Sequence, residues 1–163
     1  MARTLWLDED GRLLTLDQTR LPFLREVVEL ASCAGCEHAI RTMQVRGAPL
    51  IGAVGAYGLA FALREDAGDA ALDAARASLL ATRPTAVNLR WALERVAERV
   101  RPLPAAQRAR AAWEAACAIA DEDVECNHAI GRHAAALLAP LRRADRPLQV
   151  LTHCNAGRLA TVD

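Results

Sequence analysis

The chain has 163 residues, of which 53% are apolar, and this is enough to bury one hydrophobic core of ordinary size. Its 20 basic and 20 acidic residues give a formal net charge of zero, so the charge balance does not suggest nucleic acid or an acidic membrane surface as a partner. The longest uncharged stretch, residues 47–63, is shorter than the roughly 20 apolar residues that span a bilayer, so it predicts a buried helix and no membrane segment. The absence of a leader sequence and the odd number of cysteines, five, favour a cytoplasmic protein without a disulfide framework.

The first 30 residues predict a small β element. Residues 4–7 and 12–16 are apolar runs on either side of Asp8-Glu9-Asp10-Gly11, and Gly11 suits a turn that needs a positive φ, so these runs form a hairpin. Residues 25–30 contain two adjacent valines with partial alternation, which predicts a short strand, although a helix also fits them.

The region that follows is predicted to be helical. From Ala34 onward, apolar residues recur near the helical period, and further helices are expected at residues 69–82, 85–100 and 105–138. Gly68, Pro84 and Pro104 separate these spans, and residues 105–138 form either one helix or two that break near Gly131.

The end of the chain changes character. Residues 142–147 are a polar connector that ends in proline, so we place a domain boundary at Arg146, which divides the chain into residues 1–146 and 147–163. Residues 148–151 predict a lone β-strand that leads into His153-Cys154-Asn155-Ala156-Gly157. Because ligands of open α/β sheets bind beyond the carboxyl ends of strands, Cys154 is a candidate site residue. The chain is therefore predicted to be mainly α with a small N-terminal β element, the front part of a two-domain α/β enzyme.

Arg46-Gly47-Ala48-Pro49 precedes the apolar helix and predicts an anion site. Pro49 suits the first helical position, and the free N–H groups and dipole of the helix end attract an anion that Arg46 can bind with two parallel hydrogen bonds. Gly47 allows the backbone to approach that anion closely. The alternative interpretation is an ordinary helix start followed by solvent-exposed arginine.

A second arginine, Arg83, precedes the helix expected at residues 85–100, with Thr85 as its N-cap. The two arginines could converge on one phosphate, or Arg83 could be a solvated residue beside an ordinary cap. Asn88, in an apolar turn, is expected to bond to a group of the site or to neighbouring backbone.

Cys33-Ala34-Gly35-Cys36 has the spacing of half a zinc site or of a redox pair. A structural zinc ion needs four ligands, and no second close pair of Cys or His is present, so the motif is better explained as a helix start that carries two thiols. The sequence predicts no metal site and no cofactor.

Taken together, these motifs resemble the methylthioribose-1-phosphate isomerases. The resemblance rests on residues 5–6, 16–22, 41–52, 83–89 and 152–161, which follow in the family's order over almost the whole chain. It implies that residues 1–146 are the family's N-terminal helical domain and that residues 147–163 begin a truncated Rossmann-like catalytic domain. It also implies that Arg46, Gly47, Ala48 and Arg83 bind the sugar phosphate and that Cys154 assists at the reacting carbons.

The activity that this resemblance implies is an intramolecular oxidoreductase reaction of methionine salvage. An aldose 1-phosphate, 5-methylthioribose 1-phosphate, becomes the ketose 1-phosphate, without metal or organic cofactor and in a homodimer of the full-length enzyme. The family's catalytic aspartate lies downstream of its cysteine motif, so we expect the 163-residue chain alone to be inactive. The alternatives are an inactive remnant, a regulatory subunit-like interaction module of the same superfamily, or a related ribose-1,5-bisphosphate isomerase.

Overall fold

The computed structural model describes residues 3–153 and 156–163. The described chain begins with an antiparallel sheet in which the second strand lies in the middle, since Trp6 pairs with Leu14 and Thr15 pairs with Val28. Gly11 has a φ of +75° in the turn of the hairpin. The predicted hairpin and the short third strand are therefore confirmed. The strands are β1 (Leu5–Leu7), β2 (Leu13–Leu16) and β3 (Val27–Glu29).

The rest of the described chain is helical up to residue 141. The α-helices are α1 (Cys33–Arg41), α2 (Ala48–Glu65), α3 (Asp69–Thr82), α4 (Val87–Val100) and α5 (Ala105–Leu138). The short 3-10 helices are η1 (Ala139–Leu141) and η2 (Arg158–Ala160). The helical prediction is confirmed, α3 and α5 have the predicted bounds, and α5 continues without a break through Gly131. No helix of the described residues is both long enough and apolar enough to cross a bilayer.

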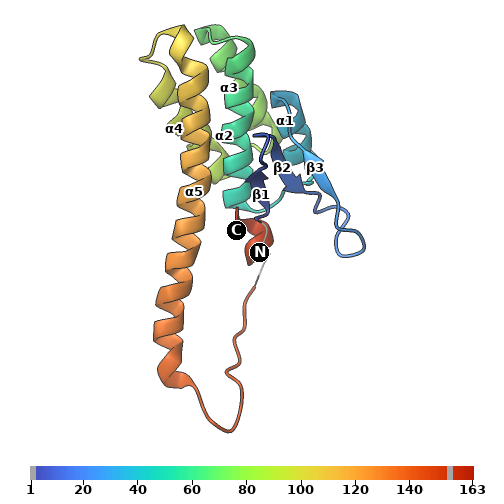
Figure 1. Ribbon diagram of the computed structural model, residues 1–163, viewed down its shortest axis with the longest axis vertical. Coiled ribbons are helices and arrows are strands. Elements are labelled where there is room, and N and C mark those ends of the chain that lie inside the picture. The colour runs from blue at the N-terminus through green and yellow to red at the C-terminus, as the bar shows by residue number, and fades with distance from the viewer. Residues whose placement is uncertain (1–2, 154–155) are drawn as a thin grey trace.

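Helix α2 is the centre of the fold. It contacts α1, α3, α4 and α5, and Figure 1 shows it between α5 and α1, with the sheet beside its N-terminal end. Its residues from Leu50 to Ala60 are all buried, as expected for a helix that is apolar on every side. The predicted buried helix is therefore confirmed.

Glycines in α2 allow close contact with α4. A Cβ atom on Gly52 would lie 2.9 Å from the carbonyl oxygen of Asn88, and one on Gly55 would lie 2.3 Å from Leu89 Cδ1. The same position on Gly55 is 3.8 Å from Leu93 Cδ2, one turn further along α4 than Leu89. Contacts that advance along α2 therefore also advance along α4, so the two helices run in the same direction. Their N-terminal ends consequently lie at the same end of the bundle.

The strand predicted at residues 148–151 is wrong. These residues form extended coil that returns from the far end of α5 toward the body (Figure 1). Val150 and Leu151 are 70% and 98% exposed. A strand requires a neighbour for its ladder of hydrogen bonds, and no described segment pairs with this one.

The C-terminal half of α5 extends beyond the rest of the bundle (Figure 1). Val124 is the last buried residue of this helix, and Ile130 and Leu137 are 60% and 76% exposed. This half of the helix therefore gains little from tertiary packing.

Arg108 joins the ends of several helices. Its guanidinium donates from Nε to Leu103 O at 2.9 Å, from Nη1 to Ala67 O at 3.0 Å and from Nη2 to Arg101 O at 3.0 Å. Nη1 also bonds to Asp69 at 2.7 Å. Helix ends leave carbonyl groups without intrahelical partners. This one buried side chain supplies hydrogen-bond donors to the carbonyl groups that follow α2 and α4.

Replacing Arg108 with methionine should lower the free energy of unfolding by about 2–4 kcal/mol, because carbonyl groups lose a charged donor in a place with little water. Methionine keeps the helix propensity and the apolar stem. Urea unfolding followed by circular dichroism measures the loss. Arg110→Met is the matched control, since Arg110 is 87% exposed and its pair with Glu114 should contribute little. Equal stability of the two variants would contradict this role.

Replacing Gly52 with alanine should lower the free energy of unfolding by about 1–3 kcal/mol, because the new methyl group can be accepted only if α4 moves away. Gly131→Ala is the control: nothing lies within 4 Å of its Cβ position, so the change should stabilise α5 by about 0.5–1 kcal/mol. Urea unfolding of both variants measures the two signs. A Gly52→Ala protein as stable as the parent would show that α2 and α4 are not in this close contact.

Candidate functional site

The loop of residues 42–47 leads from α1 into the N-terminal end of α2. Met43 lies in the left-handed region with a φ of +63°, which ends α1. The amide of Gln44 donates from Nε2 to Asp17 Oδ2 at 2.9 Å, and Gln18 N donates to Gln44 O at 2.9 Å. Burial opposes ionisation of Asp17, but hydrogen bonds from Thr19 and Gln44 outweigh it and hold the pKa of that carboxyl below its usual value. An ionised Asp17 thus fixes the loop that carries Arg46.

The N-terminal end of α2 has the features of an anion-binding helix end. Gly47 is its N-cap with a φ of +105°, and Pro49 occupies the second helical position, one later than predicted. The first turn contains no acidic side chain, so the positive end of the dipole is not neutralised from within the helix. Ala48 begins the helix, and the side chain of Arg46 is exposed beside it.

Arg83 lies at the end of α3, as its C-cap, four residues before α4 begins. The prediction of Thr85 as an N-cap is wrong, because α4 starts at Val87 with Ala86 as its cap and no side-chain bond to the helix. A turn closed by Ala86 N and Arg83 O at 2.9 Å takes up the intervening residues. Arg83 is half-buried, and the first turn of α4 also lacks an acidic residue.

The helix packing relates these two positions. Asn88, in the first turn of α4, has its carbonyl group against Gly52 in the second turn of α2, which is the neighbouring-backbone contact that the sequence allowed for Asn88. The segments that carry Arg46 and Arg83 therefore lead into helix ends that lie side by side. In the described residues neither guanidinium is in an ion pair. Convergence of both arginines on one anion stays a prediction.

The C-terminal segment lies against the same end of α2. A Cβ atom on Gly47 would be 2.3 Å from Ala160 Cα and 2.4 Å from Ala160 O, so the chain itself makes the close approach that glycine permits here. Figure 1 shows this segment, in red, below the N-terminal end of α2. From the sequence, an anion was predicted to make this close approach to Gly47.

Three residues of this region were missed by sequence reasoning. Thr4, Gln18 and Asp123 each hydrogen bond to the segment of residues 158–163, at separations of 39 to 154 residues along the chain. Gln18 belongs to residues 16–22, which carry part of the resemblance but were given no role at the site. Thr4 and Asp123 belong to no such motif, and no local signal identifies them. The predicted catalytic residue Cys154 lies outside the described residues.

The cysteines near the N-terminus do not form a reactive centre. Cys33 is the first residue of α1, as the helix-start interpretation expected, and it and Cys36 are free thiols. Burial raises the pKa of the Cys33 thiol to about 12 and also raises that of Cys36. Within residues 3–153 and 156–163, no three His, Cys, Asp or Glu side chains are grouped closely enough to hold a metal ion.

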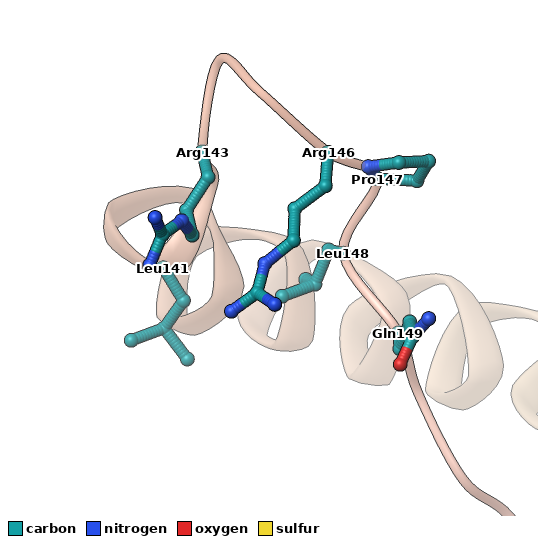
Figure 2. Close-up of a pocket in the computed structure, with 6 residues that line it drawn as sticks. All are labelled: Leu141, Arg143, Arg146, Pro147, Leu148 and Gln149. Atoms are coloured by element: carbon teal, nitrogen blue, oxygen red, sulfur yellow. The ribbon is translucent and has the colours of Figure 1, made fainter.

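A cavity of about 230 Å³ lies elsewhere, in the connector after α5. Figure 2 shows that its lining comes from one short stretch of chain, residues 141–149, which turns back on itself. Arg143 pairs with Asp145 at 3.0 Å, and the surrounding residues are exposed. This cavity is formed by a single loop at the far end of the molecule and contains none of the predicted site residues.

Known proteins are similar over nearly the whole chain. It is 55% identical to the methylthioribose-1-phosphate isomerase of Methylorubrum populi over 163 residues, which are 99% of this chain and 45% of that protein. The matched region is the N-terminal part of that enzyme, so the chain spans about half the length of the curated relatives it matches.

Two crystal structures have the same fold. The 5-methylthioribose 1-phosphate isomerase of Pyrococcus horikoshii OT3 is 36% identical with a TM-score of 0.83, covering 99% of this chain and 46% of that one. Subunit delta of the translation initiation factor eIF-2B from A. fulgidus is 37% identical with a TM-score of 0.82, covering 100% and 48%.

The family model described as the initiation factor 2 subunit family matches residues 44–162, which include most of the loop before α2, all of α2 to α5 and most of the C-terminal segment that lies against Gly47. With more than half of its residues in that match, the chain belongs to the initiation factor 2 subunit family.

Proposed function

We propose that this chain is the sugar-phosphate-binding part of a methylthioribose-1-phosphate isomerase, which interconverts an aldose 1-phosphate and a ketose 1-phosphate in methionine salvage. The observation that carries the proposal is the adjacent placement of the N-terminal ends of α2 and α4, each preceded by an arginine and each without an acidic first turn. The 55% identity to an isomerase of this name supports the choice of substrate.

The phosphate would be held by backbone and side chains together. The N–H groups of Gly47 and Ala48 lie at the positive end of α2, where a dianion is favoured, and Arg46 can add two parallel hydrogen bonds. Arg83 would approach from the end of α3 that leads into α4.

The reaction needs more than phosphate binding. An aldose whose anomeric oxygen carries phosphate does not open its ring freely, so the ring oxygen must be protonated while hydrogen moves from C2 to C1. Cys154 is proposed to assist at these carbons. A positioned proton donor contributes about 10²–10⁴-fold to such a step, and none of Arg46, Gly47, Ala48 or Arg83 is an acid that could supply it. A homodimer of the complete enzyme remains part of this proposal.

The second candidate is a non-catalytic interaction module, like a regulatory subunit of the same family. It is favoured by the similarity to subunit delta of an initiation factor, whose TM-score of 0.82 is close to that of the isomerase structure. The fold alone therefore does not separate the two functions. They differ in ligand: the isomerase reading requires a sugar-phosphate site, and the module does not.

Binding of methylthioribose 1-phosphate tests the site. Arg46→Ala and Arg83→Ala should each raise the Kd about tenfold or more, since a hydrogen bond to a charged group contributes about 1.5–3 kcal/mol. An NMR titration that follows the amides of Gly47, Ala48 and Asn88 measures the Kd and places the ligand. Arg132→Ala, on the exposed half of α5, is the control and should leave the Kd unchanged. If the parent protein does not bind the ligand, the interaction module is the better reading.

Turnover by the purified 163-residue chain is the second test. We expect no ketose to form from methylthioribose 1-phosphate, even at concentrations that saturate binding, because preorganised groups around the reacting carbons supply most of catalysis and a phosphate clamp only binds. A coupled assay for the ketose measures this, with a full-length relative as the positive control. Turnover close to that of the relative would mean that the proton donor lies among these 163 residues.

A further inference from the structure

Residues 158–163 are attached to the helical body although they are far from it in sequence. Val162 donates from its amide to Asp123 Oδ2 at 2.7 Å and accepts from Thr4 N at 2.8 Å, so both of its backbone groups are bonded to the body. Its side chain is fully buried in the hydrophobic core. Val162 is therefore the central anchor of this segment.

Further contacts fix the remainder of the segment over α2. Gln18 donates from Nε2 to Leu159 O at 2.6 Å, and Thr4 donates from Oγ1 to Arg158 O at 3.1 Å. Ala160 lies against Gly47, where a methyl group would collide with backbone at 2.3 Å. The segment thus has a shaped seat at the N-terminal end of α2.

The contact to Asp123 differs from the others because its acceptor is a carboxylate. Hydrogen bonds to an ionised acceptor are shorter and stronger than those between neutral groups. Asn127, one turn later on α5, donates from Nδ2 to Asp123 Oδ1 at 3.2 Å and to Asp123 O at 2.8 Å. This bond orients the carboxylate, so that Oδ2 faces the amide of Val162.

We propose that Asp123 is a positioning residue that seats residues 158–163 on Gly47 and so holds the segment that follows Cys154 beside the end of α2. Arg158, the first residue of the seated segment, follows Cys154 by four residues in the sequence. This role at the site rests on the proposed function. The seating itself needs no substrate, so the two can fail separately.

Amide hydrogen exchange of the 163-residue chain, read by NMR, tests the proposal. In Asp123→Ala, the amide of Val162 should exchange about tenfold faster or more, because it loses a charged acceptor, whereas the amides of α2 and of the β1–β2 ladder should keep their rates. Asp123→Asn retains a carbonyl acceptor and should restore part of the protection. Glu122→Ala is the matched control, since Glu122 is adjacent in α5 but pairs with Arg95 of α4.

Gly47→Ala approaches the same seat from the other side and should also speed exchange at Val162, because the methyl group displaces Ala160. Two results would overturn the proposal: a Val162 amide that already exchanges at the unprotected rate in the parent, or equal acceleration of all amides in Asp123→Ala, which would mean a loss of overall stability. Failure of the parent to bind phosphate in a parallel titration would count against the proposed function and not against the seat.

Discussion

Close backbone contact around α2 is the constraint on which the rest of the structure depends. A helix surrounded by four others must present small residues where its neighbours cross it, and Gly52, Gly55 and Gly58 do so. Leu89 and Leu79 fill the space that side chains would otherwise take. Because protein interiors are packed as densely as organic crystals, this contact does not accept larger side chains at these positions. It thereby determines which helix ends lie next to one another.

The sequence predicted those parts of the fold that local patterns determine. The hairpin around Gly11 and the helices at residues 69–82 and 105–138 are confirmed. These elements depend on the spacing of apolar residues and on glycines and prolines at the ends of the segment, and both can be read within the segment itself. The strand at residues 148–151 could not be judged in this way, since β-rich composition describes a preference and a ladder requires a partner elsewhere in the chain. The predicted start of α4 was also wrong. Thr85 is a residue type that often serves as an N-cap, but the turn after Arg83 leaves it outside the helix.

In the candidate site, too, local patterns could be predicted from the sequence and contacts between distant segments could not. The motif at Arg46 and Gly47 predicted the start of a helix, which is confirmed, because a glycine before a helical proline is typical of a helix N-terminus. Its role in binding an anion stays a prediction. Arg83 was predicted at the start of α4 but is the C-cap of α3, since the sequence does not show that it ends one helix instead of starting the next. Its role in binding phosphate also stays a prediction. The contact of Asp123 could not be predicted from the sequence. Asp123 is an ordinary acidic residue in a long helix, and the amide that it binds belongs to a segment 39 residues later that folds back onto it.

The exposed half of α5 has a consequence for how this helix melts. Nucleating a helix is costly, whereas extending one adds a hydrogen bond for each residue fixed. The packed turns up to Val124 act as a nucleus, and the turns beyond it are an extension that depends on the intrinsic preferences of residues such as Ala129 and Gly131. Local stability should consequently decrease as a gradient toward Leu138, so that this half frays progressively while the bundle stays folded.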